Sequence, residues 1–141
     1  MQDYKLFIPL VGRILLANIF LTDGINKIPN YENVAEYMFL KGVPEFLLPF
    51  AIAFEIVGAL AIIIGWRTKF FSLLFFSFCI LTAVLFHTPF RSSMDEISFM
   101  KNLSLAGGFL FLFLHGGGHL SFENFRKHDL YLSENKLTRC W

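Results

Sequence analysis

The sequence predicts an all-α membrane protein, a bundle of four transmembrane helices. Of the 141 residues, 55% are hydrophobic and only 16% are charged, whereas a soluble domain has about 25% charged residues. In addition, four apolar segments are each close to the roughly 20 residues that cross the hydrocarbon core as a helix. They cover residues 6–28, 46–65, 70–87 and 97–115.

The first segment is unusually polar for a membrane span. Its stretch GRILLANIFLTDGINKI contains Arg13, Asn18, Asp23 and Lys27. Because these residues interrupt the hydrophobic run and no small-x-small cleavage site follows, we expect a retained span rather than a signal peptide.

The connection after the first span predicts a short amphipathic helix on the membrane surface. Asn30 is a suitable N-cap and Gly42 a suitable end. Between them, one helical face carries a stripe of mainly apolar side chains, which is typical of an interfacial helix in the first outer loop. The stripe consists of Val34, Tyr37, Met38 and Lys41.

The second and fourth spans each carry a face with small and polar residues, which we expect to point into the bundle while Phe and Leu face lipid. In the second span the face is Ala51, Glu55, Gly58, Ile62 and Gly65; in the fourth it is Lys101, Ser104, Gly108, Phe111 and His115.

The distribution of basic residues predicts the topology. We expect a membrane domain over residues 1–120 and a polar tail over residues 121–141. The N-terminus, the turn after the second span and the tail share one side, and they carry most of the basic residues, so both termini are predicted to be cytoplasmic. These residues are Lys5, Arg67, Lys69, Arg126, Lys127, Lys136 and Arg139.

Charged residues within the spans should find partners, because an isolated charge in the bilayer is costly. At about 1.5 Å per residue, Arg13 and Glu55 fall in the middle third of the membrane. Asp23 and Lys101 both fall roughly 6–7 Å below the outer surface of the membrane. We therefore expect the ion pairs Arg13–Glu55 and Asp23–Lys101.

Two interpretations of these charges stay open. They are packing pairs that define one bundle arrangement, or they line an outward-facing polar pocket that binds a ligand or relays protons. The candidate site residues are Asp23, Lys27, Glu55, His87, Lys101 and Asn102.

Several classes of function find no support. A net charge of +1 without a basic stripe argues against nucleic acid. Cys79 and Cys140 form no C-x-x-C pair, which thiol-to-quinone electron transfer needs. No set of residues suggests a metal site, and none forms a self-sufficient catalytic constellation, so whether the chain is an enzyme stays open.

Six blocks of sequence resemble, in order, those of the DoxX family, over about residues 10–124. They are LVGRILLANIFLTDGINKI, LKGVP, FEIVGALAIIIGWRTK, VLFHTPF, FMKNLSLAGGFLFL and GGGHLSFEN. The resemblance implies a four-helix, multi-pass protein of a bacterial-type inner membrane. It places the family's characteristic positions on Arg13, Gly24, Lys27, Glu55, Gly58, Gly65, Thr68, His87, Lys101, Asn102, Gly107 and Gly108.

The family takes its name from a small subunit associated with quinol oxidase and thiosulfate:quinone oxidoreductase activities. The resemblance thus implies a membrane subunit or scaffold of a quinone-linked redox or detoxification complex, without a covalent cofactor but with quinone as a candidate ligand. Its partners would be the lipid bilayer, proteins of the redox complex and, as an open question, further copies of the chain. The alternative is a stand-alone small-molecule or proton-coupled transporter that uses Glu55 and the Lys101 region.

Overall fold

The computed structural model describes residues 4–89 and 92–126 and consists of helices over those ranges. Four of the helices are long and apolar enough to cross a membrane, which confirms the predicted fold class. The elements are α1 (Tyr4–Lys27), α2 (Tyr31–Leu40), the 3₁₀ turn η1 (Glu45–Leu47), α3 (Leu48–Ile64), α4 (Thr68–His87) and α5 (Ser93–His115).

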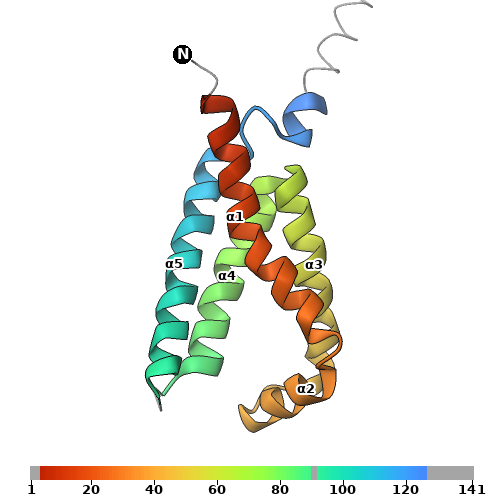
Figure 1. Cartoon of the computed structure of the whole chain (residues 1–141), viewed down its shortest axis with the longest axis vertical. Coiled ribbons are helices and arrows are strands. Elements are labelled where there is room, and N and C mark those ends of the chain that lie inside the picture. The colour runs from red at the N-terminus through yellow and green to blue at the C-terminus, as the bar shows by residue number, and fades with distance from the viewer. Residues whose placement is uncertain (1–3, 90–91, 127–141) are drawn as a thin grey trace, which may run out of the picture.

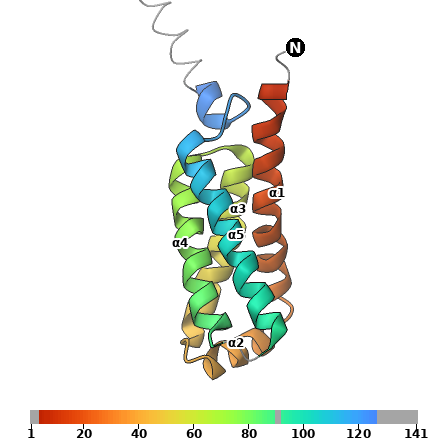
Figure 2. The ribbon, with the colours of Figure 1, turned by 90° about the vertical axis from the view of Figure 1, so that its left-hand side faces the viewer.

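The four long helices form two closely packed pairs. α1 packs mainly on α3 and α4 mainly on α5, and the pairs lie side by side (Figure 1). α2 lies across one end of the bundle, whereas the start of α1 and residues 122–126 lie at the other end (Figures 1 and 2). The predicted tail lies outside the described residues from position 127 onward.

The centre of the bundle is aromatic. The ring of Phe75 on α4 lies 4.7 Å from that of Phe20 and stacks on that of Phe109 at 5.0 Å, and all three side chains are buried. Rings of this size fill the space between the two helix pairs. The expectation that Phe residues face lipid is therefore wrong for these positions.

The predicted inner face of α3 is confirmed at Glu55, Gly58 and Ile62, which are all buried. The predicted inner face of α5 is wrong. Lys101, Ser104, Phe111 and His115 are exposed, and α5 instead buries Ala106, Phe109 and Leu112. In lipid, burial gives an apolar residue little advantage, so packing decides which face turns inward; here the stacking of Phe109 on Phe75 defines that face.

The predicted helix between Asn30 and Gly42 is present as α2. Asn30 occupies the N-cap position but makes no side-chain cap bond; its amide Nδ2 donates to the carbonyl of Asn26 instead. The far end of α2 is fastened to α4, because Lys41 Nζ donates a 2.6 Å hydrogen bond to the carbonyl oxygen of Phe86. α2 therefore closes this end of the bundle.

Candidate ligand-binding cavity

A cavity of about 450 Å³ lies beneath α2, between the two helix pairs. All six candidate residues predicted from the sequence line it, although they come from four different long helices. They are Asp23 and Lys27 from α1, Glu55 from α3, His87 from α4, and Lys101 and Asn102 from α5. The structure thus brings together residues that are up to 79 positions apart in the chain, from 23 to 102.

The most buried charge in the cavity is Glu55, and its partner is Lys27. The ammonium Nζ of Lys27 lies 2.5 and 2.6 Å from the two carboxylate oxygens of Glu55 and 2.8 Å from a carboxylate oxygen of Asp23. The Glu55 side chain is 1% exposed, that of Lys27 20% and that of Asp23 61%. Lys27 therefore links a carboxylate inside the bundle to one at its surface.

Close contact between α1 and α3 sets this pairing. A Cβ atom on Gly24 would lie 3.1 Å from Cβ of Glu55 and 2.9 Å from Cγ1 of Ile56. Only glycine allows α1 to lie so near to α3. Because Gly24 is level with Glu55, Lys27 lies one helical turn further along and can bend back to reach the carboxylate.

The expected ion pair between Arg13 and Glu55 is wrong. Arg13 is 11 positions from Gly24 along α1, which corresponds to roughly 16 Å of helical rise, so its side chain cannot reach Glu55. Instead, Nη2 of Arg13 donates a 2.5 Å hydrogen bond to the carbonyl of Leu120, beyond the end of α5. Arg13 therefore belongs to the opposite end of the bundle.

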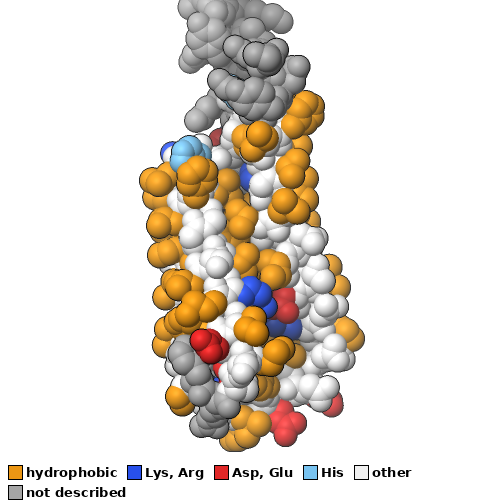
Figure 3. Space-filling model, turned by 60° about the vertical axis from the view of Figure 1, so that its left-hand side comes forward, with side chains coloured by type: hydrophobic (Ala, Val, Ile, Leu, Met, Phe, Trp, Pro, Cys, Tyr) orange, Lys and Arg blue, Asp and Glu red, His pale blue; other side chains and the backbone are white. Residues whose placement is uncertain are grey.

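The expected ion pair between Asp23 and Lys101 is also not formed, because the carboxylate of Asp23 is paired with Lys27. Lys101 makes no salt bridge with another described residue. Asp23, Lys101 and Asn102 do line a shared hollow of about 410 Å³ between α1 and α5. Figure 3 shows basic and acidic side chains together in the lower half of a largely apolar face.

His87 ends α4 at the rim of the cavity. Its ring atom Nδ1 is buried and has no hydrogen-bond partner among the described residues, and it lies 4.0 Å from a carboxylate oxygen of Asp95. The imidazole therefore has a ring nitrogen near the cavity that makes no hydrogen bond to a described residue.

The remaining wall of the cavity is mainly apolar and aromatic, with Phe20, Tyr37, Phe78 and Phe86 among the lining side chains. Tyr37 stacks on Phe86 with 5.7 Å between the ring centroids and 19° between the ring planes. Sequence reasoning assigned α2 to the membrane surface and missed its role as a wall. The stripe of Val34, Tyr37 and Met38 was the available signal, since all three side chains face the cavity.

A cavity of this kind suits a small amphipathic molecule. Its volume lies within the roughly 300–1,000 Å³ of typical small-molecule sites, which combine apolar walls with a few polar groups. Lys101 and Asn102 offer N–H donors, and His87 offers a ring nitrogen that makes no hydrogen bond to a described residue. No group of three or more His, Cys, Asp or Glu residues in the described part of the chain could hold a metal ion.

Comparison with known proteins agrees with a membrane protein. The sequence model of the DoxX family matches residues 8–88. The chain is 43% identical over 114 residues to the inner membrane protein YqjF of Escherichia coli, covering 81% of this chain and 88% of that protein. It is 31% identical over 121 residues to the inner membrane protein YphA of the same organism, covering 81% and 86%. No solved structure matches the chain.

Proposed function

Since the chain belongs to the DoxX family, we propose that it is a small membrane subunit of a quinone-linked redox complex in a bacterial-type inner membrane. In this role the cavity beneath α2 binds the head of a quinone. The observation that carries the proposal is the amphipathic character of the cavity, which is lined both by the six candidate residues from four helices and by aromatic side chains.

The residues of the cavity fit the chemistry of a quinone head. Its ring is flat and apolar and suits the side chains of Phe20, Phe78 and Phe86, whereas its two carbonyl oxygens accept hydrogen bonds. Lys101, Asn102 and His87 can donate such bonds; Nδ1 of His87 is buried and makes no hydrogen bond to a described residue. A bound quinone would supply the two-electron redox chemistry, and the chain would hold and orient it.

The charge network around Lys27 favours a second candidate function, a proton-coupled transporter. Lys27 joins the buried carboxylate of Glu55 to the exposed carboxylate of Asp23, and a chain of ionisable groups from the interior to the surface can carry protons. Flux of a solute or of protons in proteoliposomes that contain this chain alone would support the transporter and argue against the subunit.

Filling the cavity tests the proposed binding function. Ala51 lines the cavity, whereas Ala53 is exposed on another face of the same helix α3. A phenylalanine at position 51 should exclude a short-chain benzoquinone, and one at position 53 should not. Photo-crosslinking with an azido-benzoquinone, followed by peptide mapping, measures the difference. Equal labelling of Ala51→Phe and Ala53→Phe would place the quinone outside the cavity and remove the basis of the proposal.

The subunit role needs a separate measurement. Purification from native membranes in mild detergent should retain oxidoreductase subunits with the wild-type chain. Their absence, together with unchanged quinone-dependent respiration in cells that lack the protein, would contradict a role in a redox complex.

A further inference from the structure

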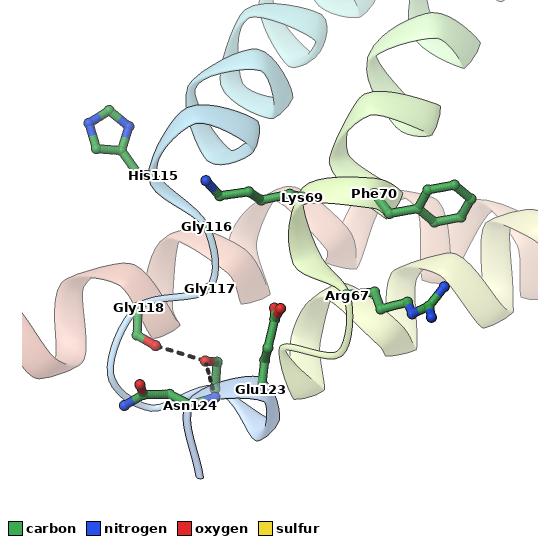
Figure 4. A pocket seen from close by; sticks show the side chains of 10 residues that line it. Arg67, Lys69, Phe70, His115, Gly116, Gly117, Gly118, Glu123 and Asn124 are labelled. Atoms are coloured by element: carbon green, nitrogen blue, oxygen red, sulfur yellow. Dashed lines mark hydrogen bonds between the residues drawn. The ribbon is translucent and has the colours of Figure 1, made fainter. Parts of the chain in front are cut away.

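We propose that this protein has a second site, at the bundle end opposite α2, which binds a phosphate-type oxyanion. The site is a cavity of about 410 Å³ between the first turn of α4 and the exit loop, residues 116–120, that follows α5. It shares no lining residue with the cavity beneath α2, so the inference is independent of the proposed function. Figure 4 shows the exit loop on one side and the α3–α4 turn on the other.

A buried cation that forms no salt bridge with a described carboxylate lies next to the wall of this cavity. Arg13 is 0% exposed, and its Nε and Nη1 atoms have no hydrogen-bond partner among the described residues. No described carboxylate forms a salt bridge with it. Nη1 lies 3.2 Å from the place where Gly117, which lines the cavity, would carry a Cβ atom. Arg13 does not itself line the cavity, but its guanidinium lies next to Gly117, a lining residue without a side chain.

The first turn of α4 adds further donors at the same place. The first N–H groups of a helix have no intrahelical acceptor, and the helix dipole makes this end attractive to anions. Thr68 begins α4 and is 0% exposed, and its hydroxyl Oγ1 has no hydrogen-bond partner among the described residues. This hydroxyl lies 2.7 Å from the Cβ position of Gly117, so it faces the same wall as Arg13.

Two exposed basic residues flank the cavity, and one acidic residue enters it. The side chain of Lys69 lies over the exit loop, with Cε 3.4 Å from the Cβ position of Gly116, and Arg67 lies at the rim with its guanidinium directed away (Figure 4). The carboxylate of Glu123 points from the tail side into the space between the loop and the turn (Figure 4). Among the described residues, Lys69 is therefore the basic side chain that lies over the cavity, with Arg67 at its rim, Arg13 behind its wall and the carboxylate of Glu123 inside it.

This arrangement matches a tetrahedral oxyanion rather than a cation or an apolar group. A phosphate offers several acceptor oxygens to a hydroxyl, backbone N–H groups and basic side chains at once. It would also bring a negative charge near Arg13, which pairs with no carboxylate of the described residues. The same chemistry is present in a phospholipid headgroup at the membrane surface and in free phosphate; basic pockets between membrane helices are known to bind lipid headgroups.

The test compares three single substitutions of exposed residues. Lys69→Gln should weaken binding about fivefold, since one basic side chain near an anionic surface contributes roughly 1 kcal/mol. Glu123→Gln should strengthen binding, because it removes the carboxylate that competes for the site. Arg126→Gln is the matched control, because Arg126 is exposed near this end of the bundle but does not line the cavity.

The measurements separate the two sources of the anion. The full chain, delipidated in neutral detergent, is mixed with phosphatidylglycerol or phosphatidylcholine, and bound lipid is counted by native mass spectrometry. A parallel thermal-unfolding series uses inorganic phosphate against chloride at equal ionic strength.

The site has a lipid headgroup as its ligand if the protein retains more phosphatidylglycerol than phosphatidylcholine and the variants change this retention as predicted. The site has free phosphate as its ligand if inorganic phosphate stabilises the protein more than chloride does, the variants change this stabilisation as predicted, and neither lipid is retained in preference. The proposal fails if neither ligand binds better than its control, or if Arg126→Gln weakens binding as much as Lys69→Gln. It also fails if Glu123→Gln does not strengthen binding.

Discussion

Replacing Lys27 with methionine should strongly destabilise the bundle, because it leaves the carboxylate of Glu55 buried without a cation. Removing one partner of a buried ion pair typically costs about 3–5 kcal/mol. The carboxylate is 1% exposed but the Lys27 side chain is 20% exposed, and Glu55 can take up a proton to relieve the loss. We therefore expect a cost near the lower limit, about 3 kcal/mol.

Asp23 provides a matched control within the same network. Its carboxylate contacts the same ammonium at 2.8 Å but is 61% exposed. Exposed ion pairs contribute roughly 0–1 kcal/mol, so Asp23→Asn should cost at most about a third of the Lys27→Met loss. The difference between the two losses of stability separates the effect of burial from the effect of the charge itself.

The assay is reversible unfolding in mixed micelles with increasing dodecyl sulfate, followed by circular dichroism. The double variant Lys27→Met/Glu55→Gln removes the unpaired charge and should be more stable than the sum of the single losses by about 1–2 kcal/mol, since contacting residues show coupling of this size. If the losses add, or if Asp23→Asn costs as much as Lys27→Met, then Lys27 is not the counter-ion that stabilises Glu55.

Two further predictions concern topology and the glycines. The topology can be tested in intact cells with a variant that lacks the native cysteines. A membrane-impermeant thiol reagent should label Asn33→Cys but not Phe122→Cys, because the basic residues predict cytoplasmic termini. Labelling of Phe122→Cys would contradict this topology. Gly65→Ala should cost more than about 2 kcal/mol, because Gly65 has a φ of +83° and an added Cβ would collide with Arg13. Gly107→Ala, with no atom within 4 Å of the added Cβ, should gain roughly 0.5–1 kcal/mol in the same unfolding assay.

The four spans and the short helix between the first two could be predicted because they depend on local features. Hydrocarbon thickness sets the length of an apolar segment, and glycine or proline marks its end. Gly65 illustrates this, because it ends α3 in the left-handed conformation. The six candidate residues, which the structure places around one cavity, could be singled out because polar and ionisable side chains in apolar segments are costly.

The partners of these residues could not be predicted, and the reason is geometric. The position of a residue along a span gives its depth in the membrane, which is only one coordinate. Which side chains meet also depends on the rotation of each helix and on the level at which two helices touch. The sequence by itself determined that Glu55 needs a cation; only the contact of Gly24 with Glu55 decided that Lys27 supplies it.

The same reason explains Arg13 and the inner face of α5. Arg13 was recognised as a buried cation, but its contact with Leu120 depends on how the exit loop after α5 lies against α1. On α5, small and polar residues suggested one inner face, and the stacking of Phe109 on Phe75 selected another. The sequence determined which segments cross the membrane and which side chains need partners, because both follow from transfer to lipid. Tertiary packing decided which partners they find, because that depends on contacts between helices distant in the chain.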